Sequence, residues 1–124
     1  MKFPLQIIFR NIDRSLWLER LVEKKAKKLE LFCQDIMSCR VVVERPHKHD
    51  HGANFYCMHI DISVPNDEIL VSRTAYKGVT REVITVVNDA FDAAKRQLED
   101  YVRCRRNQLK IHRPKQNEES LVKQ

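Results

Sequence analysis

A chain of 124 residues, 43% of them hydrophobic, is long enough for one packed core and too short for two. Two glycines and four prolines exclude a collagen-like or low-complexity chain, and no apolar run is long enough to cross a membrane. The formal charge of +6 favours a polyanionic partner. Residues 1–10 lack the apolar core and cleavage site of a signal peptide, which predicts a cytoplasmic protein.

Catalysis is not expected. The sequence contains no nucleophile constellation, no glycine-rich phosphate loop and no nicotinamide fingerprint, and nothing in it calls for a cofactor or a small-molecule substrate. The four cysteines form no Cys-x-x-Cys pair, so we expect reduced, half-buried thiols at Cys33, Cys39, Cys57 and Cys104.

The first half of the chain predicts a strand followed by a helix. Residues 3–9 are rich in strand-forming side chains, and Asn11, Asp13 and Ser15 offer helix caps. Residues 16–32 then show apolar side chains at steps of three and four, which predicts an amphipathic helix. Its apolar stripe consists of Leu18, Leu21, Val22, Ala26, Leu29 and Phe32.

Three further strands are predicted at residues 36–44, 55–64 and 68–74, with a polar turn region at 45–54 and a tight turn at 65–67. The strand 55–64 alternates most clearly, since Met58, Ile60 and Ile62 share one face while Cys57 and His59 share the other. This alternation indicates one buried and one largely solvated face. Together these strands predict an antiparallel meander.

Residues 79–109 predict a long second helix, whose last turns past Val102 are basic and are expected to project beyond the sheet. Its predicted core stripe is Val83, Val86, Val87, Ala90, Ala94, Leu98 and Tyr101. The order β-α-β-β-β-α is most simply satisfied by a two-layer α+β sandwich, a four-stranded mixed sheet with two helices on one face. We therefore expect one domain over residues 1–110 and a flexible tail over 111–124.

Charge divides the first helix into separate flanks. At about 100° per residue, Glu19, Glu23 and Glu30 fall on one flank, while the outer face and opposite flank carry Arg20, Lys24, Lys27 and Lys28. Such a basic ridge can follow a phosphate backbone. A solvated helix with i,i+4 ion pairs, such as Glu23 with Lys27, is an equally open interpretation.

The second helix carries basic residues among acidic ones. Asp92 is expected to pair with Arg96 and Glu99 with Arg103, which leaves an excess of cations near the C-terminal end, around Arg103, Arg105 and Arg106. The planar guanidinium of arginine suits phosphates and base stacking.

A histidine cluster offers a second possibility. His47, His49 and His51 alternate in the turn region, and His59 lies on the next strand, so a hairpin could bring them together as ligands for zinc. No metal-site spacing is matched, and a polar hairpin tip remains open as the simpler interpretation.

The segment Val22 to Phe32, Val-Glu-Lys-Lys-Ala-Lys-Lys-Leu-Glu-Leu-Phe, resembles the first-helix signature of the ribosome hibernation-promoting factor family. This family includes the ribosome-associated translation inhibitor and has been labelled sigma-54 modulation protein. The valine-rich strand, the His/Lys hairpin tip, the strand 55–64 and Lys95-Arg96-Gln97-Leu98 are placed as in that family. The resemblance covers residues 3–108.

This resemblance implies a fold like that of double-stranded-RNA-binding domains. It also implies binding in the small-subunit channel for messenger and transfer RNA, which would inhibit translation in stressed cells. The cations implied to contact 16S ribosomal RNA are Lys24, Lys25, Lys27, Lys28, Lys95, Arg96, Arg103, Arg105 and Arg106. Glu99 and Asp100 stand where the family tends to carry lysines, which predicts a smaller rRNA contribution from the second helix.

Three functions therefore remain open from the sequence. The first is a ribosome-binding translation inhibitor, and the second is a metal-binding or sensing module that uses His47, His49, His51 and His59. The third is a protein-interaction module of the same fold, in which Val42 and Phe55 are exposed on the open face of the sheet.

Overall fold

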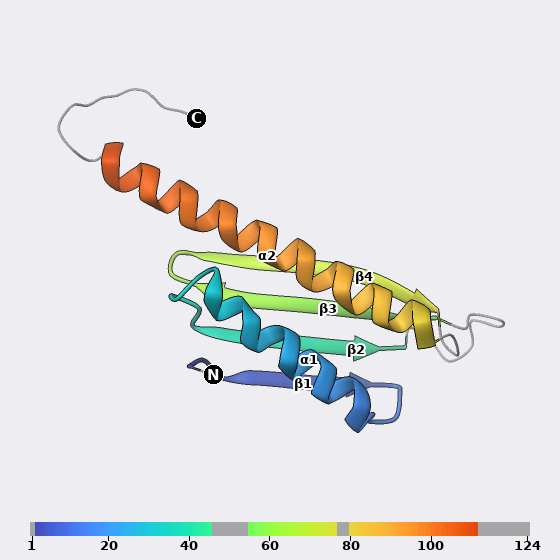
Figure 1. Ribbon diagram of the computed structural model, residues 1–124. Coiled ribbons are helices and arrows are strands. Elements are labelled where there is room, and N and C mark those ends of the chain that lie inside the picture. The colour runs from blue at the N-terminus through green and yellow to red at the C-terminus, as the bar shows by residue number, and fades with distance from the viewer. Residues whose placement is uncertain (1, 46–54, 77–79, 112–124) are drawn as a thin grey trace.

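The structure is a computed structural model that describes residues 2–45, 55–76 and 80–111 (Figure 1). The predicted order β-α-β-β-β-α is confirmed. The elements are β1 (Leu5–Arg10), α1 (Leu16–Lys28), a 3₁₀ turn (Leu29–Leu31), β2 (Ser38–Glu44), β3 (Phe55–Val64), β4 (Asp67–Tyr76) and α2 (Thr80–Ile111). No helix in these ranges is both long enough and apolar enough to cross a membrane.

The four strands form one mixed sheet in the order β1-β2-β3-β4. β1 lies parallel to β2, with Ile7 opposite Val41, while β2, β3 and β4 form the predicted antiparallel meander. Parallel neighbours require a crossover connection, which α1 supplies between β1 and β2. Both helices lie on the same face of the sheet (Figure 1), so the predicted two-layer α+β fold is confirmed.

α1 begins where the sequence predicts and ends earlier. The Ser15 hydroxyl accepts a hydrogen bond from the backbone N–H of Leu18 at 3.2 Å, so Ser15 is the N-cap. The predicted helix to Phe32 is wrong over its last turn, because the chain tightens there into a 3₁₀ turn. The backbone N–H of Phe32 bonds to the carbonyl of Leu29 at 3.0 Å, a tightening that is common at helix ends.

The strand boundaries differ from the prediction at β1, β2 and β4. β1 begins at Leu5, since Pro4 lacks a backbone N–H, although Phe3 is buried. β2 begins at Ser38 rather than residue 36. β4 reaches Tyr76 because it pairs along the whole of β3. The turn between them places Asn66 at φ 66°, a left-handed conformation that asparagine tolerates well.

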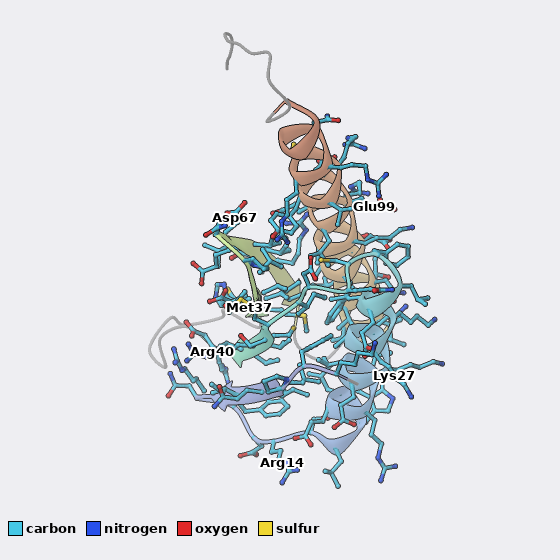
Figure 2. The ribbon with its side chains drawn as sticks, turned by 90° about the vertical axis from the view of Figure 1, so that its left-hand side faces the viewer. Arg14, Lys27, Met37, Arg40, Asp67 and Glu99 are labelled. Carbon is cyan, nitrogen blue, oxygen red and sulfur yellow. The ribbon has the colours of Figure 1, made fainter. Side chains whose placement is uncertain are left out.

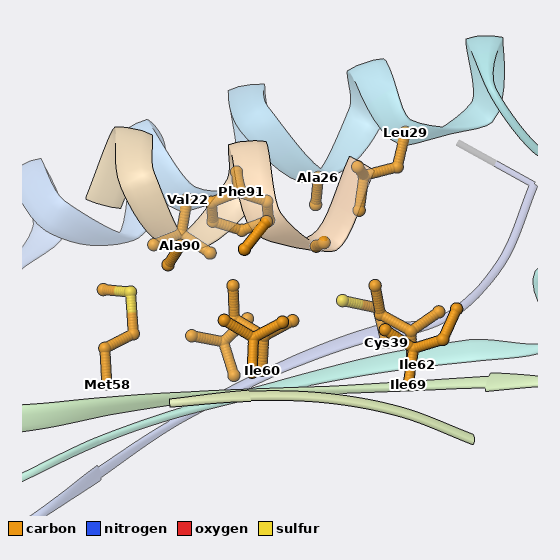
Figure 3. Packing of buried hydrophobic residues seen from close by; sticks show 14 of the residues in the cluster. Val22, Ala26, Leu29, Cys39, Met58, Ile60, Ile62, Ile69, Ala90 and Phe91 are labelled. Carbon is orange, nitrogen blue, oxygen red and sulfur yellow. The ribbon is translucent and has the colours of Figure 1, made fainter. Parts of the chain in front are cut away.

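The core lies between the sheet and the two helices (Figure 3). Met58, Ile60 and Ile62 project from β3 toward Val22 of α1 and Ala90 of α2, as the alternation of β3 predicted. The stripe of α2 is wider than predicted, because Phe91 and Ala93 are also buried. Of the predicted stripes, Leu21, Phe32, Val86 and Tyr101 are only partly buried.

The thiols differ in accessibility more than the sequence suggested. All four cysteines are free, as expected, but Cys33 and Cys39 are buried, Cys57 is half-buried and Cys104 is exposed. Burial raises the pKa of the Cys39 thiol to about 12 and also raises the pKa of the Cys33 thiol. Since the thiolate is the nucleophile, we expect both buried thiols to react slowly near neutral pH.

Alkylation therefore should discriminate among the cysteines. We expect iodoacetamide at pH 8 to modify Cys104 rapidly in the folded protein, while Cys33 and Cys39 react only after denaturation. Intact-mass and peptide-mass measurements over time check this. Equal rates at Cys39 and Cys104 in the folded protein would contradict the packing described here.

Candidate nucleic-acid interface

The outer face of α1 carries a row of exposed cations. We call Arg20, Lys24, Lys27 and Lys28 the basic ridge; all four side chains are exposed. They lie on the side of α1 opposite Val22, which is fully buried against the sheet, and Figure 2 shows Lys27 pointing away from the sheet. Within the part of the chain that the structure describes, no salt bridge involves any of the four. The ridge is therefore an open cationic surface.

The acidic flank of α1 lies toward β1, and Glu23 marks its border with the basic ridge, since Glu23 also lines a hollow with Arg20, Lys24 and Lys27. Glu19 and Glu23 line a groove with Leu5, Ile7 and Phe9 of β1. Arg14 donates two hydrogen bonds to Glu19, at 2.7 and 2.9 Å, and these bonds hold the pKa of the Glu19 carboxyl below its usual range. Among the described residues no salt bridge joins Glu23 to Lys27. The alternative interpretation, a solvated helix stabilised by that ion pair, is therefore not supported.

Lys25 lies apart from the ridge and is half-buried. Lys95 of α2 is also half-buried, and its ammonium nitrogen lies 4.7 Å from the centre of the Phe32 ring. This distance allows a cation–π interaction. The contact holds one cation of α2 beside the end of α1.

Arg96, Arg103 and Arg106 are exposed on α2. The predicted partner of Arg103 is wrong, because Arg103 pairs with Asp100 rather than Glu99; the two side chains are three residues apart and share one side of the helix. The predicted Asp92–Arg96 pair is absent from the salt bridges of the described residues. Arg96 and Arg106 therefore remain open cations.

Arg105 is engaged within the protein. Its guanidinium donates to Asp35, before β2, at 2.8 Å and to the Tyr101 hydroxyl at 3.0 Å. The same hydroxyl donates to the carbonyl of Pro65, in the β3–β4 turn, at 2.8 Å. Burial raises the pKa of the Tyr101 hydroxyl above its ordinary value. These bonds fix this part of α2 to two loops of the sheet, so Arg105 is already engaged within the protein.

Sequence reasoning missed Trp17. This side chain is 49% exposed near the start of α1, beside Leu16, which is 58% exposed. Trp17 precedes Arg20 by three residues and Lys24 by seven, a spacing that places the three on one side of the helix. That spacing is visible in the sequence and could have placed the indole at the head of the basic ridge.

The histidine cluster falls mostly outside the described residues, which exclude His47, His49 and His51. Nδ1 of His59 lies 2.8 Å from the Ser72 hydroxyl on the open face of the sheet. Within the described ranges no three metal-ligating side chains gather at one point. The expectation that Val42 is exposed is wrong: it is only 8% exposed, because neighbouring strands cover it on both sides. The Phe55 side chain lies outside the described set.

The fold combines a mixed four-stranded sheet with two helices on one face, and the outer face of α1 carries a row of exposed cations. These features define a small α+β protein suited to a polyanion. The chain belongs to the family described as sigma 54 modulation protein / S30EA ribosomal protein, whose sequence profile matches residues 5–106. The family assignment that the first-helix segment suggested is thereby confirmed.

Two solved structures share the fold. A ribosomal subunit interface protein from Coxiella burnetii matches with a TM-score of 0.64 and 15% identity, over 79% of this chain and 96% of that one. The N-terminal domain of Thermus thermophilus Protein Y matches with a TM-score of 0.59 and 20% identity, over 77% of this chain and 94% of that one. No curated protein shows a significant sequence match.

Proposed function

We propose that this protein binds the small ribosomal subunit through 16S rRNA and inhibits translation by occupying the channel for messenger and transfer RNA. The observation that carries the proposal is the basic ridge, four exposed lysine and arginine side chains that no described salt bridge neutralises. An unneutralised row of cations on a rigid helix releases counterions when it meets a phosphate backbone. Family membership, and the similarity to a ribosomal subunit interface protein from Coxiella burnetii, make ribosomal RNA the preferred polyanion.

The predicted contacts differ in their roles under this proposal. Lys24, Lys27 and Lys28 contact phosphates directly, and Arg96 and Arg106 extend the surface along α2. Lys25 and Lys95 are half-buried, so they contribute less to phosphate binding than the exposed cations do. Arg105 is paired with Asp35 and contributes mainly by positioning α2, whereas Arg103 is paired with Asp100 on the same helix and is partly neutralised.

Occlusion is tested by competition on 30S subunits. Labelled messenger RNA and initiator transfer RNA are bound to 30S subunits, and the protein is added at increasing concentration. We expect filter binding to show loss of both RNAs at the protein concentration that saturates the subunits. Simultaneous retention of messenger RNA, transfer RNA and saturating protein would overturn occlusion while leaving rRNA binding intact.

Trp17 provides a direct optical probe of the surface, since it is the protein's only tryptophan. An exposed indole in line with cations suits stacking on an unpaired base, which contributes about 1–3 kcal/mol. We expect single-stranded RNA to quench Trp17 fluorescence, and Trp17→Ala to lower affinity by roughly tenfold. Trp17→Phe should keep most of the affinity because it keeps an aromatic face. Unchanged fluorescence at saturating RNA would remove Trp17 from the interface.

A further inference from the structure

β1 forms an open edge of the sheet, since among the described elements it pairs only with β2 (Figure 1). Two hydrogen bonds at the ends of β1 show which of its backbone groups are already paired with β2. The N–H of Cys39 donates to the carbonyl of Pro4, and the N–H of Arg45 donates to the carbonyl of Arg10, both at 3.0 Å. Backbone groups alternate between the two edges of a strand. The even-numbered residues therefore bond to β2, and the N–H and C=O groups of the odd-numbered residues point outward.

Those odd-numbered residues, Leu5, Ile7 and Phe9, also line the groove beside α1. Their partly buried side chains form one side of a groove of about 620 Å³, and Arg14, Glu19 and Glu23 form the other. An extended chain placed along β1 can therefore use the outward backbone groups while its alternate side chains enter the groove. Strand addition at a sheet edge combines main-chain hydrogen bonds with side-chain pockets in this way.

Charge identifies the occupant. Glu19 is already bonded to Arg14, whereas Glu23 is exposed and takes part in none of the salt bridges of the described residues. Within the groove lining, Glu23 is therefore the charge that no described salt bridge neutralises, which disfavours an anionic occupant, and a second copy paired edge to edge about a two-fold axis would bring two such carboxylates together. Lysine or arginine fits best, because its aliphatic stem can cover Ile7 while its charged head reaches Glu23.

We propose that the β1 edge binds an extended basic segment of another protein by strand addition, with lysine or arginine at alternate positions. The groove lies between α1 and β1, the basic ridge lies on the outer face of α1, and Glu23 borders both. One molecule can therefore hold RNA on the outer face of α1 and a basic polypeptide on the β1 edge. This second site goes beyond the proposed rRNA contact and does not depend on it.

Backbone amide exchange on the intact protein tests the site. The probe is a ten-residue peptide that alternates lysine with threonine, and its matched control carries glutamate in place of every lysine. We expect the amides of Leu5, Ile7 and Phe9 to exchange quickly in the free protein, and the lysine peptide to slow them by about tenfold or more. Gln6 and Ile8, already bonded to β2, should change little. No slowing, or equal slowing by the glutamate peptide, would overturn the proposal.

A charge reversal in the groove provides a second test of the proposed site. Glu23→Lys should weaken binding of the lysine peptide by about tenfold, while Glu99→Lys, the same change at an exposed position on α2, should leave it within about twofold. Because Glu23 also borders Arg20, Lys24 and Lys27, Glu23→Lys should keep or strengthen association with 30S subunits while it weakens peptide binding, and these opposite directions separate the two sites. Protection of the β1 amides by self-association without peptide would also contradict the proposed occupant.

Discussion

Reversing two charges of the basic ridge, Lys24→Glu together with Lys28→Glu, is expected to abolish association with 30S subunits at moderate salt. Both side chains are exposed on the outer face of α1, one turn apart, so both can reach successive phosphates. Loss of two phosphate contacts and the added repulsion should weaken binding on the order of 100-fold and reduce the slope of log affinity against log salt by about two. Co-sedimentation at several salt concentrations measures both quantities.

The matched control is Arg10→Glu with Arg40→Glu, which changes the net charge by the same amount on strands β1 and β2, where both residues line the open face of the sheet. Arg40 lies on the side of the sheet opposite to Lys27 (Figure 2), and both arginines are exposed. The control should bind within a few-fold of the unchanged protein, because rim charges remote from a contact act only through screened long-range attraction. Equal losses in both double variants would mean that total charge, rather than the ridge, determines binding.

The largest expected effect on stability is at the centre of the core. Ile60 is 1% exposed and lies between Val41 and Val71 on the neighbouring strands. Ile60→Ala removes three carbon atoms from a packed site and should lower the free energy of unfolding by about 3 kcal/mol. Urea unfolding followed by circular dichroism gives this value directly.

Leu70→Ala is the control for the core substitution, since it removes a similar volume from a position that is 61% exposed on the adjacent strand. It should cost less than about 0.5 kcal/mol. If the two variants lost equal stability, Ile60 would not occupy the centre of the core, and the assignment of the two faces of β3 would be wrong.

Much of the fold could be predicted because its periodicities are unambiguous. The alternation in β3 predicted Met58, Ile60 and Ile62 as buried, and both bounds of that strand agree with the structure. The end of α1 could not be predicted, since a 3₁₀ turn and a last helical turn bury the same residue, Leu29. Burial of Phe91 depends on the contact between α2 and its neighbours, which a single-helix pattern does not encode.

The charges of the candidate site were predictable in position and only partly in their partners. Helical geometry alone placed the ridge and the acidic flank of α1 on different sides. The role of Arg105 depends on Asp35, seventy positions away in the sequence, so no local rule could find it. The groove at β1 likewise requires the parallel pairing of β1 with β2, which brings Leu5, Ile7 and Phe9 beside Glu23.

The most direct test of ribosome binding is sucrose-gradient sedimentation of purified ribosomes with added protein, at low and at moderate salt. The proposal predicts that the protein travels with 30S or 70S particles at low salt and is released as salt rises, since the cations of the ridge compete with counterions for phosphate. Protein that stays at the top of the gradient even at low salt would contradict ribosome binding through 16S rRNA.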